Sequence, residues 1–315
     1  MFFMIKKVAF RMSRLIYVLV NNNIKKWPSI LGVTNLDILF QTILLRHRGN
    51  ETYQKEISYL KEKGEIDIFP YKNIKQIGEI ISGYNDDEGL PYIIHNNRHL
   101  YFPDTWTQDK VRKVYKNFIE VENILGGGFA EKTPHQYQTE TFCVKGNDIL
   151  LDVGCAEALF TLDILGKVNI KKAILFESDS QWFKPLNATF KPEIESGKVV
   201  LIEKMVTDKN SDKSITINSA LENEDYGGLF IKMDIEGYES KVVETCRDLM
   251  KLNKDIRFSC CTYHKQHDAD VLMSLFKSNG YNTEFSDGYM LFFTDKLITF
   301  PYFRKGIIRA SKNIL

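Results

Sequence analysis

The chain has few cysteines, and none of them is arranged as a disulfide framework or a zinc site would require. Its five cysteines are odd in number, and no Cys-x-x-Cys pair occurs. That usage is typical of reduced, mostly buried thiols, so it predicts a cytosolic protein. The cysteines are Cys143, Cys155, Cys246, Cys260 and Cys261.

An excess of charge of one sign is also absent. Lys and Arg total 42 against 41 Asp and Glu, which leaves a net charge of +1. No overall charge draws the chain to a polyanion, so we predict no nucleic-acid partner. Hydrophobic content of 43% with 26% charged residues is ordinary for a soluble globular protein, and 315 residues suffice for one large domain with an appendage, or for two domains.

No uncharged apolar run is long enough to cross a bilayer. Residues 1–20 are apolar but interrupted by basic residues, and no small-residue cleavage site follows, so neither a signal peptide nor a transmembrane helix is predicted. The pattern favours an amphipathic helix that either docks on the protein or lies on a membrane surface. Its apolar residues include Phe3, Phe10 and Val18, and the basic residues are Lys6, Lys7, Arg11 and Arg14.

The C-terminal residues 300–315 have a similar composition. We predict a solvated or docked helix; the alternative is that both basic ends place the protein peripherally at the inner face of a membrane, beside anionic lipid. The basic residues of this tail are Arg304, Lys305, Arg309 and Lys312.

A dinucleotide-binding G-x-G-x-x-G turn is missing as well. Residues 149–160 read as a buried strand, a tight turn at Gly154 and a helix start, but Ala156 and Ala158 stand where glycines would admit a pyrophosphate. Glycine lets a backbone approach a ligand closely, whereas alanine suits such a turn only if its φ is negative. This disfavours an NAD-dependent oxidoreductase.

A second acidic strand end narrows the ligand. Residues 173–177 are apolar and end in Glu177, about 20 residues past the turn, where a doubly wound fold places the carboxylate that binds ribose hydroxyls. A ligand with a ribose and no pyrophosphate fits both features. S-adenosylmethionine is such a ligand, because its carboxylate suits a helix N-terminus.

Strand and helix patterns alternate from residue 148 onward, which predicts an α/β fold with a mostly parallel sheet. Two final strands, 281–285 and 289–293, are predicted to form a hairpin through residues 286–288, which makes seven strands. The other predicted strands are 149–153, 173–177, 199–203, 229–233 and 256–261, and the helices include 181–190, 238–252 and 268–278.

Before this sheet we expect an accessory region of mixed helices and strands. Gly126–Gly128 would end a helix and open a loop that serves either as a lid over the site or as a linker. We expect four segments: accessory region 1–105, connecting helix and glycine-rich loop 106–140, sheet domain 141–295 and basic tail 296–315. Within the accessory region we predict helices 35–48 and 51–63, with a C-cap at Gly64, and hairpin strands 92–95 and 99–102, with His95 and His99 at the surface.

Residues 230–239, Phe-Ile-Lys-Met-Asp-Ile-Glu-Gly-Tyr-Glu, carry a more specific signal. They resemble the Lys-x-Asp-hydrophobic-Glu-Gly-x-Glu signature of FkbM-type methyltransferases, and the resemblance extends over about residues 133–293. It implies the Rossmann-like seven-strand sheet of class I methyltransferases and S-adenosylmethionine-dependent O-methylation of a sugar or other small-molecule hydroxyl. The other blocks that carry it are 175–179, Trp182, 203–208 and 262–264.

Ligands of open α/β sheets lie beyond the carboxyl ends of the strands, so residues there are the candidate cofactor site. We expect Asp152 near the methionine amino group, the amides of Gly154 and Cys155 near the cofactor, Glu177 on the ribose and Val206 beside the adenine. The full predicted set is Asp152, Gly154, Cys155, Glu157, Glu177, Ser178, Val206 and Asp234.

The predicted catalytic residues are Asp234, His264 and Glu236. A sugar hydroxyl is a poor nucleophile near neutral pH, so a base is expected, and Asp234 or His264 could serve. Alternatively, Asp234 and Glu236 orient their loop and cap the following helix. Lys232 is interpreted as either a buried-edge or a paired lysine within its strand.

No cluster of His, Cys, Asp and Glu has zinc spacing, which predicts no structural metal. A loosely held magnesium at Asp234 and Glu236 stays open. A rival function is a binding or scaffold protein with a methyltransferase-like fold and no turnover, which the alanines at positions 156 and 158 motivate.

Overall fold

The computed structural model describes residues 35–72, 77–126, 132–293 and 299–313. The chain divides into two compact units, which are taken separately below: unit 1 is Met1–Lys72 with Gly288–Lys305, and unit 2 is Asn73–Asp287 with Gly306–Leu315. The amphipathic helix predicted for residues 1–20 lies outside the described residues.

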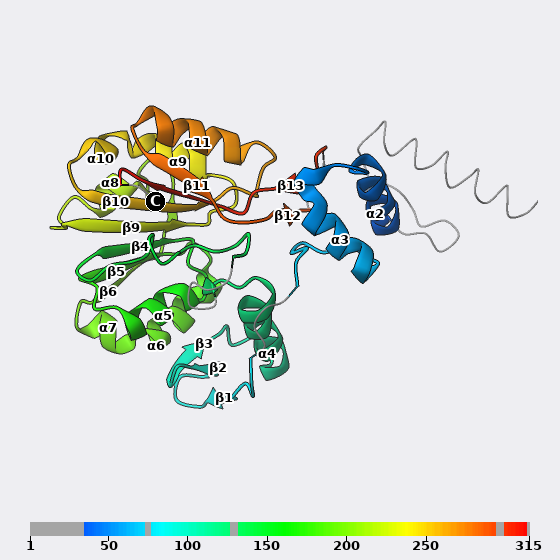
Figure 1. The fold of residues 1–315 in the computed structure, drawn as a ribbon. Coiled ribbons are helices and arrows are strands. Elements are labelled where there is room, and N and C mark those ends of the chain that lie inside the picture. The colour runs from blue at the N-terminus through cyan, green and yellow to red at the C-terminus, as the bar shows by residue number, and fades with distance from the viewer. Residues whose placement is uncertain (1–34, 73–76, 127–131, 294–298, 314–315) are drawn as a thin grey trace, which may run out of the picture. The chain divides into compact units, whose positions relative to one another are not determined.

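Unit 2 is built on a seven-stranded sheet of order β11-β14-β10-β9-β4-β5-β6 (Figure 1). β6, β5, β4, β9 and β10 are parallel neighbours, and β14 runs antiparallel to both β10 and β11. The Rossmann-like α/β fold with seven strands is therefore confirmed. The strands are β4 (Ile149–Val153), β5 (Lys172–Phe176), β6 (Val199–Ile202), β9 (Gly228–Met233), β10 (Asp255–Cys261), β11 (Asn282–Phe285) and β14 (Ile307–Ser311).

Helices cover both faces of this sheet, with α9, α10 and α11 on one side and α5, α6 and α7 on the other (Figure 1). Alternate strand residues such as Leu151, Ile231 and Phe258 pack with Val242 and Phe276 in one buried core. Because the central strands are buried on both faces, their sequences are mostly apolar, with a few buried polar residues such as Asp152, Lys232 and Arg257, and this is why their positions were predictable. The helices are α5 (Leu159–Lys167), α6 (Phe183–Thr189), α7 (Lys191–Glu195), α8 (Ile217–Ala220), α9 (Glu239–Thr245), α10 (Arg247–Lys251) and α11 (Asp268–Ser278), and β7 (Met205–Val206) pairs with β8 (Ser214–Ile215).

The predicted terminal hairpin and helical tail are both wrong. β11 pairs with β14, not with residues 289–293, so the chain's last described strand lies inside the sheet. Arg309 faces Glu284 across this pair, with its Nε donating to the carboxylate at 2.7 Å, and Ile307 and Ile308 are buried. Arg304 and Arg309 are each 4% exposed, so they do not form the basic membrane-facing surface that the tail's composition indicated.

A small antiparallel sheet precedes the large one in unit 2. Its strands are β1 (Ser82–Asn85), β2 (Leu90–His95) and β3 (Arg98–Tyr101), and α4 (Gln108–Lys116) follows and continues into a π-helical turn, Asn117–Val121. The β2–β3 turn uses Asn96 and Asn97 with φ of 49° and 63°, as predicted. His99 is exposed, but the prediction for His95 is wrong: its ring is buried and lies 2.8 Å from the Tyr115 hydroxyl.

Unit 1 combines two separate stretches of sequence. Its elements are α2 (Asn35–Arg46), a 3₁₀ turn (Glu51–Tyr53), α3 (Gln54–Lys63) and the strand pair β12 (Met290–Leu291) and β13 (Phe303–Arg304). Leu39, Ile43, Leu60, Leu291 and Phe303 share its core, and Gly64 ends α3 at a φ of 78°, as predicted. Residues 288–305 therefore complete unit 1 rather than the large sheet.

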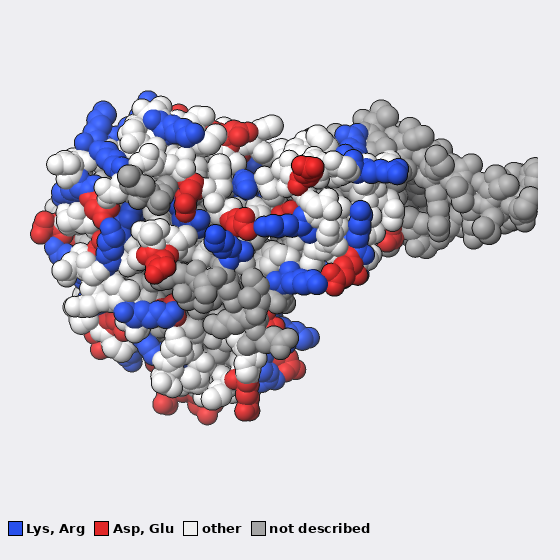
Figure 2. Space-filling view, viewed as in Figure 1, with Lys and Arg blue, Asp and Glu red and all other residues white. Residues whose placement is uncertain are grey.

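The surface of the described residues carries charges of both signs. Figure 2 shows Lys and Arg side chains interspersed with Asp and Glu side chains over the visible face, in line with the net charge of +1. Among the helices that the structure describes, none combines the length and the apolar character needed to span a membrane.

Candidate functional site

The carboxyl ends of β4 and β9 meet at Gly154. A Cβ on this residue would lie 2.0 Å from the carbonyl oxygen of Asp234, and its φ is 72°, so only glycine fits. The amide of Asp234 in turn donates to the carbonyl of Val153 at 2.9 Å. The turn after β4 is thereby held against the backbone of Asp234.

Backbone amides of this turn have partners inside the protein. Gly154 and Cys155 both donate to the carbonyl of Phe176, at 3.0 and 3.1 Å, and Ala156 donates to Glu177 Oε2 at 2.9 Å. The amides of Ser178 and Asp179 donate to Glu177 Oε1, each at 2.7 Å. The structure therefore gives the Gly154 and Cys155 amides a role in the turn rather than the ligand contact predicted for them, while Glu177 stays half-buried at the end of β5.

Asp152 is enclosed completely. Its carboxylate accepts from Lys232 Nζ at 2.8 Å and from the Thr161 hydroxyl at 2.7 Å, and the residue is 0% exposed. Lys232 also donates to the carbonyl of Gly154 at 3.2 Å. The interpretation of Lys232 as a paired lysine is confirmed, and the structure does not present Asp152 to a methionine amino group.

Both alanines of the turn adopt the left-handed conformation, with φ of 46° at Ala156 and 56° at Ala158. The two alanines therefore occur at positive φ, whereas alanine was expected from the sequence to suit this turn only at negative φ. An L-residue in this region is disfavoured by about 1–2 kcal/mol relative to glycine. The turn after β4 thus keeps a glycine-type backbone at two positions that lack glycine.

Replacing Ala156 by glycine is expected to raise the free energy of unfolding by about 1 kcal/mol, because it relieves this strain. Urea denaturation measures it. The matched control is Ala188→Gly in α6, which is expected to lose about 1 kcal/mol because helical glycine is unfavourable. Destabilisation of both variants would show that the Ala156 methyl contributes more packing than its φ costs.

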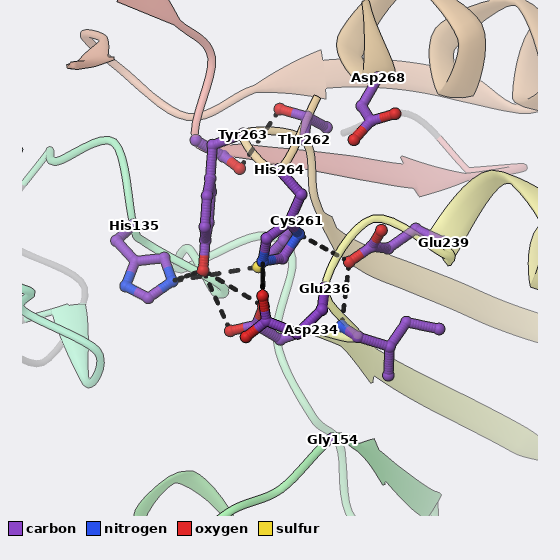
Figure 3. A network of polar contacts seen from close by, with 12 residues as sticks. His135, Gly154, Asp234, Glu236, Glu239, Cys261, Thr262, Tyr263, His264 and Asp268 are labelled. Carbon is purple, nitrogen blue, oxygen red and sulfur yellow. Dashed lines mark hydrogen bonds and ion pairs between the residues drawn. The ribbon is translucent and has the colours of Figure 1, made fainter. Parts of the chain in front are cut away.

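A polar cluster lies beyond the ends of β9 and β10, centred on Asp234 (Figure 3). The hydroxyl of Tyr137 lies 3.2 Å from Asp234 Oδ2, and that of Tyr263 lies 3.2 Å from both carboxylate oxygens. His264 Nε2 is 3.3 Å from Oδ1. We call Asp234, Tyr137, Tyr263, His264, His135 and Cys261 the Asp234 cluster.

His264 lies between two carboxylates. Its Nδ1 is 3.0 Å from Glu239 Oε1, while its Nε2 faces Asp234 (Figure 3). Burial lowers the pKa of His264, but Glu239, Asp234 and Glu236 together raise it to about 9. The imidazole is therefore protonated near neutral pH.

Asp234 is an anion in this setting. Burial tends to raise the pKa of its carboxyl, but the neighbouring cations, His264 first and Lys232 next, more than offset that effect and lower it. The Asp234 side chain keeps 25% of its exposure, whereas that of His264 keeps 6%. The cluster therefore holds an ionised carboxylate that remains accessible at the strand ends.

His135 supplies a second imidazole to the cluster, and its protonation state differs from that of His264. Its Nε2 lies 3.0 Å from the Tyr137 hydroxyl and 3.5 Å from that of Tyr263. Burial lowers its pKa to about 4, so the ring is neutral at physiological pH. Tyr137 thus bridges a neutral imidazole and an ionised carboxylate.

Two further carboxyl groups near the turn are shifted toward their neutral form. Burial and the charge of Asp234 raise the pKa of Glu122 to about 7, and burial raises that of Glu157, which is 6% exposed, to about 8. A cationic ligand would let both groups ionise, because an opposite charge lowers a carboxyl pKa. Glu157 was predicted from the sequence, whereas Glu122 was not.

The structure brings Asp234 and His264 together, and Glu236 lies at the exposed edge of the same cluster. The Glu236 side chain is 94% exposed, with φ of 58° and its Oε2 3.9 Å from His264 Nε2. Val206 is buried in the core, and Ser178 is exposed. Sequence reasoning missed Tyr137, His135, Cys261, Tyr263, Glu239 and Glu122 as members of the site.

Residues 133–138 provide two of the missed side chains. They are buried, and their backbone is tied to the sheet: Ser259 donates to the carbonyl of Tyr137 and Arg309 to that of Gln136, both at 2.8 Å. The described part of the loop that begins at Gly126 is therefore anchored on β10 and β14, and it presents His135 and Tyr137 to Asp234.

His135, Asp234 and Cys261 offer donor atoms within 4.8 Å of one another, a grouping that could hold a metal ion. Tyr137 contacts all three: its hydroxyl is 3.0 Å from His135 Nε2, 3.2 Å from Asp234 Oδ2 and 3.5 Å from Cys261 Sγ. Hydrogen bonds through this phenol are sufficient to account for the grouping.

Comparison with known proteins yields distant structural similarity. No protein-family model and no curated sequence matches the chain. Its structure is similar to methyltransferase FkbM of Methylobacillus flagellatus KT, with a TM-score of 0.42 and 15% identity over 56% of this chain and 47% of that chain. The similar region thus spans about half of the FkbM structure.

Two other solved structures show weaker similarity. A precorrin-6y C5,15-methyltransferase of Geobacter metallireducens GS-15 has a TM-score of 0.36 and 14% identity, covering 54% of this chain and 83% of that chain. An rRNA methylase of Streptococcus thermophilus has a TM-score of 0.35 and 12% identity, covering 54% of this chain and 90% of that chain. Similarity at this distance assigns neither an activity nor an acceptor.

Proposed function

We propose that unit 2 is an S-adenosylmethionine-dependent methyltransferase that methylates a hydroxyl group of a sugar or glycan-related molecule. The observation that carries the proposal is Asp234, an ionised and accessible carboxylate at the carboxyl end of β9, in contact with the turn at Gly154. Ligands of this fold class lie at that edge of the sheet.

The residues around the turn fit a cationic methyl donor. Glu177 keeps a half-buried carboxylate at the end of β5, which suits ribose hydroxyls. Glu122 and Glu157 are carboxyl groups whose ionisation a sulfonium or ammonium ion would favour. When bound, the cofactor supplies an electrophilic methyl group whose bond to sulfur breaks as the bond to the acceptor oxygen forms.

Asp234 then has one chemical task, which is to take the proton of the acceptor hydroxyl. His264 does not compete for this role near neutral pH, because its imidazole is already protonated. Tyr137 and Tyr263 donate to Asp234 and thereby orient its two oxygens. Orientation of nucleophile and base contributes much of the acceleration of such displacements.

The same cluster supports an acceptor that carries hydroxyl groups. Two phenols and a neutral imidazole surround the carboxylate, and these groups hydrogen-bond hydroxyl groups. The described surface mixes basic and acidic side chains (Figure 2), which favours a small neutral acceptor over a polyanion. RNA is the competing acceptor in the same assay. The unpaired thiols support a cytosolic location.

Calorimetric titration with S-adenosylhomocysteine is expected to show saturable binding, with NADH as the control that does not bind. Selective binding of the thioether supports the proposed cofactor class and justifies a screen of glycans, lipid-linked sugars and RNA as acceptors. Absence of binding to a folded protein contradicts it.

A second candidate is a binding protein of this fold without turnover. Its support is the left-handed backbone at Ala156 and Ala158, which narrows the turn with two methyl groups. Cofactor affinity without transfer to any acceptor class would favour it over the enzyme.

A further inference from the structure

Glu239 is the most deeply buried acidic residue beside the Asp234 cluster. It is the first residue of α9 and is 0% exposed. Its Oε1 accepts the amide of Ile235 at 2.9 Å and lies 3.0 Å from His264 Nδ1, whereas its Oε2 has no hydrogen-bond partner among the described residues. A buried carboxylate is costly unless a cation compensates it, and the cation within reach is His264.

The three side chains form a line of contacts, Glu239–His264–Asp234, in which the imidazole contacts both carboxylates and donor atoms of all three residues lie within 4.8 Å of one another (Figure 3). Contact of the two ring nitrogens with two carboxylates, at 3.0 and 3.3 Å, restricts the position of the ring. The His264 side chain is 6% exposed, so solvent does little to screen either contact. Asp234 is the accessible end of the line and Glu239 the closed end.

We propose that Glu239 is a positioning residue that holds His264 as an oriented imidazolium, and that this imidazolium keeps Asp234 ionised and directed toward the acceptor hydroxyl. The catalytic consequence rests on the proposed function, whereas the charge and orientation of His264 do not. Glu239 acts through His264 and does not itself contact the acceptor.

Other titratable and charged groups also face His264, and they come from several elements. Glu236 lies 3.9 Å from Nε2, but its side chain is 94% exposed and therefore screened by water. Glu239 combines the shortest of these contacts with complete burial. The groups are Asp234 and Glu236 after β9, Glu239 on α9, Asp268 on α11, His135 in residues 132–139, and Lys232 on β9, with Lys265 next in the chain.

The experiment is a ¹H–¹⁵N NMR titration of the imidazoles in the full chain, which has six histidines. In the wild type we expect His264 to titrate near pH 9. The variant Glu239→Gln keeps the shape and removes the charge, and it is expected to lower the pKa of His264 by about one unit or more. The matched control Glu236→Gln is expected to shift it by less than about half a unit.

The wild-type protein tests the proposal even if Glu239→Gln fails to fold. Titration of wild-type His264 at or below its ordinary pKa of 6.5 would overturn it, as would equal shifts in the two variants. The conservative variant Glu239→Asp, which keeps the charge, is expected to retain a raised pKa at His264. Loss of that elevation in Glu239→Asp would overturn the proposal, because a carboxylate at position 239 would then not be sufficient to raise the pKa of His264.

Activity adds a second readout once a substrate is known. Glu239→Gln is expected to lower kcat about tenfold or more with little change in the KM for the cofactor, because its effect passes through Asp234. The NMR titration needs no methyl donor. A protein that shows the shift but binds no S-adenosylhomocysteine would refute the proposed function and leave the role of Glu239 intact.

Discussion

Replacing Asp234 by asparagine is expected to lower kcat for methyl transfer by about 10³-fold, while S-adenosylhomocysteine still binds. Removal of a positioned general base typically costs between about 10² and 10⁴ in rate. Asparagine has nearly the same volume, and its carbonyl oxygen can still accept from Tyr137 or Tyr263, so the cluster should stay assembled. What the variant loses is the negative charge to which we assign removal of the hydroxyl proton.

Steady-state transfer of labelled methyl groups measures this effect, with calorimetry as the binding control. Glu236→Gln is the matched comparison, because this neighbouring acid has a side chain that is 94% exposed, and it should stay within about threefold of wild type. Activity of Asp234→Asn above one tenth of wild type would remove Asp234 from the role of base. Equal losses in both variants would indicate that the whole loop, rather than one carboxylate, was disturbed.

The lowered pKa of Asp234 also sets the pH range of the reaction. A base of lowered pKa is ionised at all pH values above its ordinary range, so no acid limb due to Asp234 is expected near neutrality. His264 remains protonated until the pH approaches 9, and its deprotonation would withdraw the charge that stabilises the Asp234 anion. The two groups therefore keep their charges across the physiological range.

The central strands were predictable because burial on both faces imposes a local signal. β4, β5, β9 and β10 are rich in apolar residues, and each observed boundary lies within one residue of its prediction. β14 gave no such signal. Arg309 occupies a buried position in it, and the partner that makes this tolerable, Glu284, lies 25 residues away.

The part of the candidate site that lies at strand ends was predictable, because strand ends can be located from the sequence. Asp234 and His264 follow strands whose ends converge at one edge of the sheet, so the strand-end rule found them. Tyr137 reaches Asp234 across 97 residues from a segment without regular structure, and no local periodicity indicates that contact. A single sequence places strand ends, but it does not show which distant loop folds over them.

Asp152 illustrates a different limit. Its position at a strand end is typical of a ligand-binding acid, yet its partner is Lys232, directly opposite in the β4–β9 register. Register between two strands 80 residues apart cannot be read from either strand alone. Two aspartates at strand ends therefore differ in their surroundings: Asp152 pairs with a buried lysine, whereas Asp234 stays accessible.

Replacing Lys232 by methionine is accordingly expected to lower the free energy of unfolding by about 3–5 kcal/mol, since it leaves the buried carboxylate of Asp152 without its cation. The pair is nearly inaccessible, with side chains 8% and 0% exposed and 2.8 Å between Nζ and Oδ1. The pKa of Lys232 is raised: burial would lower it, but Asp152 and Asp234 outweigh that effect. A raised lysine pKa stabilises the fold fully below the pKa of the unfolded chain, so the whole contribution is present at neutral pH.

Urea denaturation at neutral pH measures the loss, and Lys172→Met on β5, which is separated from β9 by β4, is the matched control. Lys172 pairs with Glu224 at 2.5 Å, but the two side chains are 24% and 19% exposed, so its loss is expected to cost about 1 kcal/mol or less. Adding Asp152→Asn to Lys232→Met should recover part of the lost stability, because the neutral amide can keep its contact with Thr161. An equal loss of stability in Lys232→Met and Lys172→Met would mean that a proton or a water molecule compensates the Asp152 carboxylate. The role of Lys232 would then be its contact with the carbonyl of Gly154.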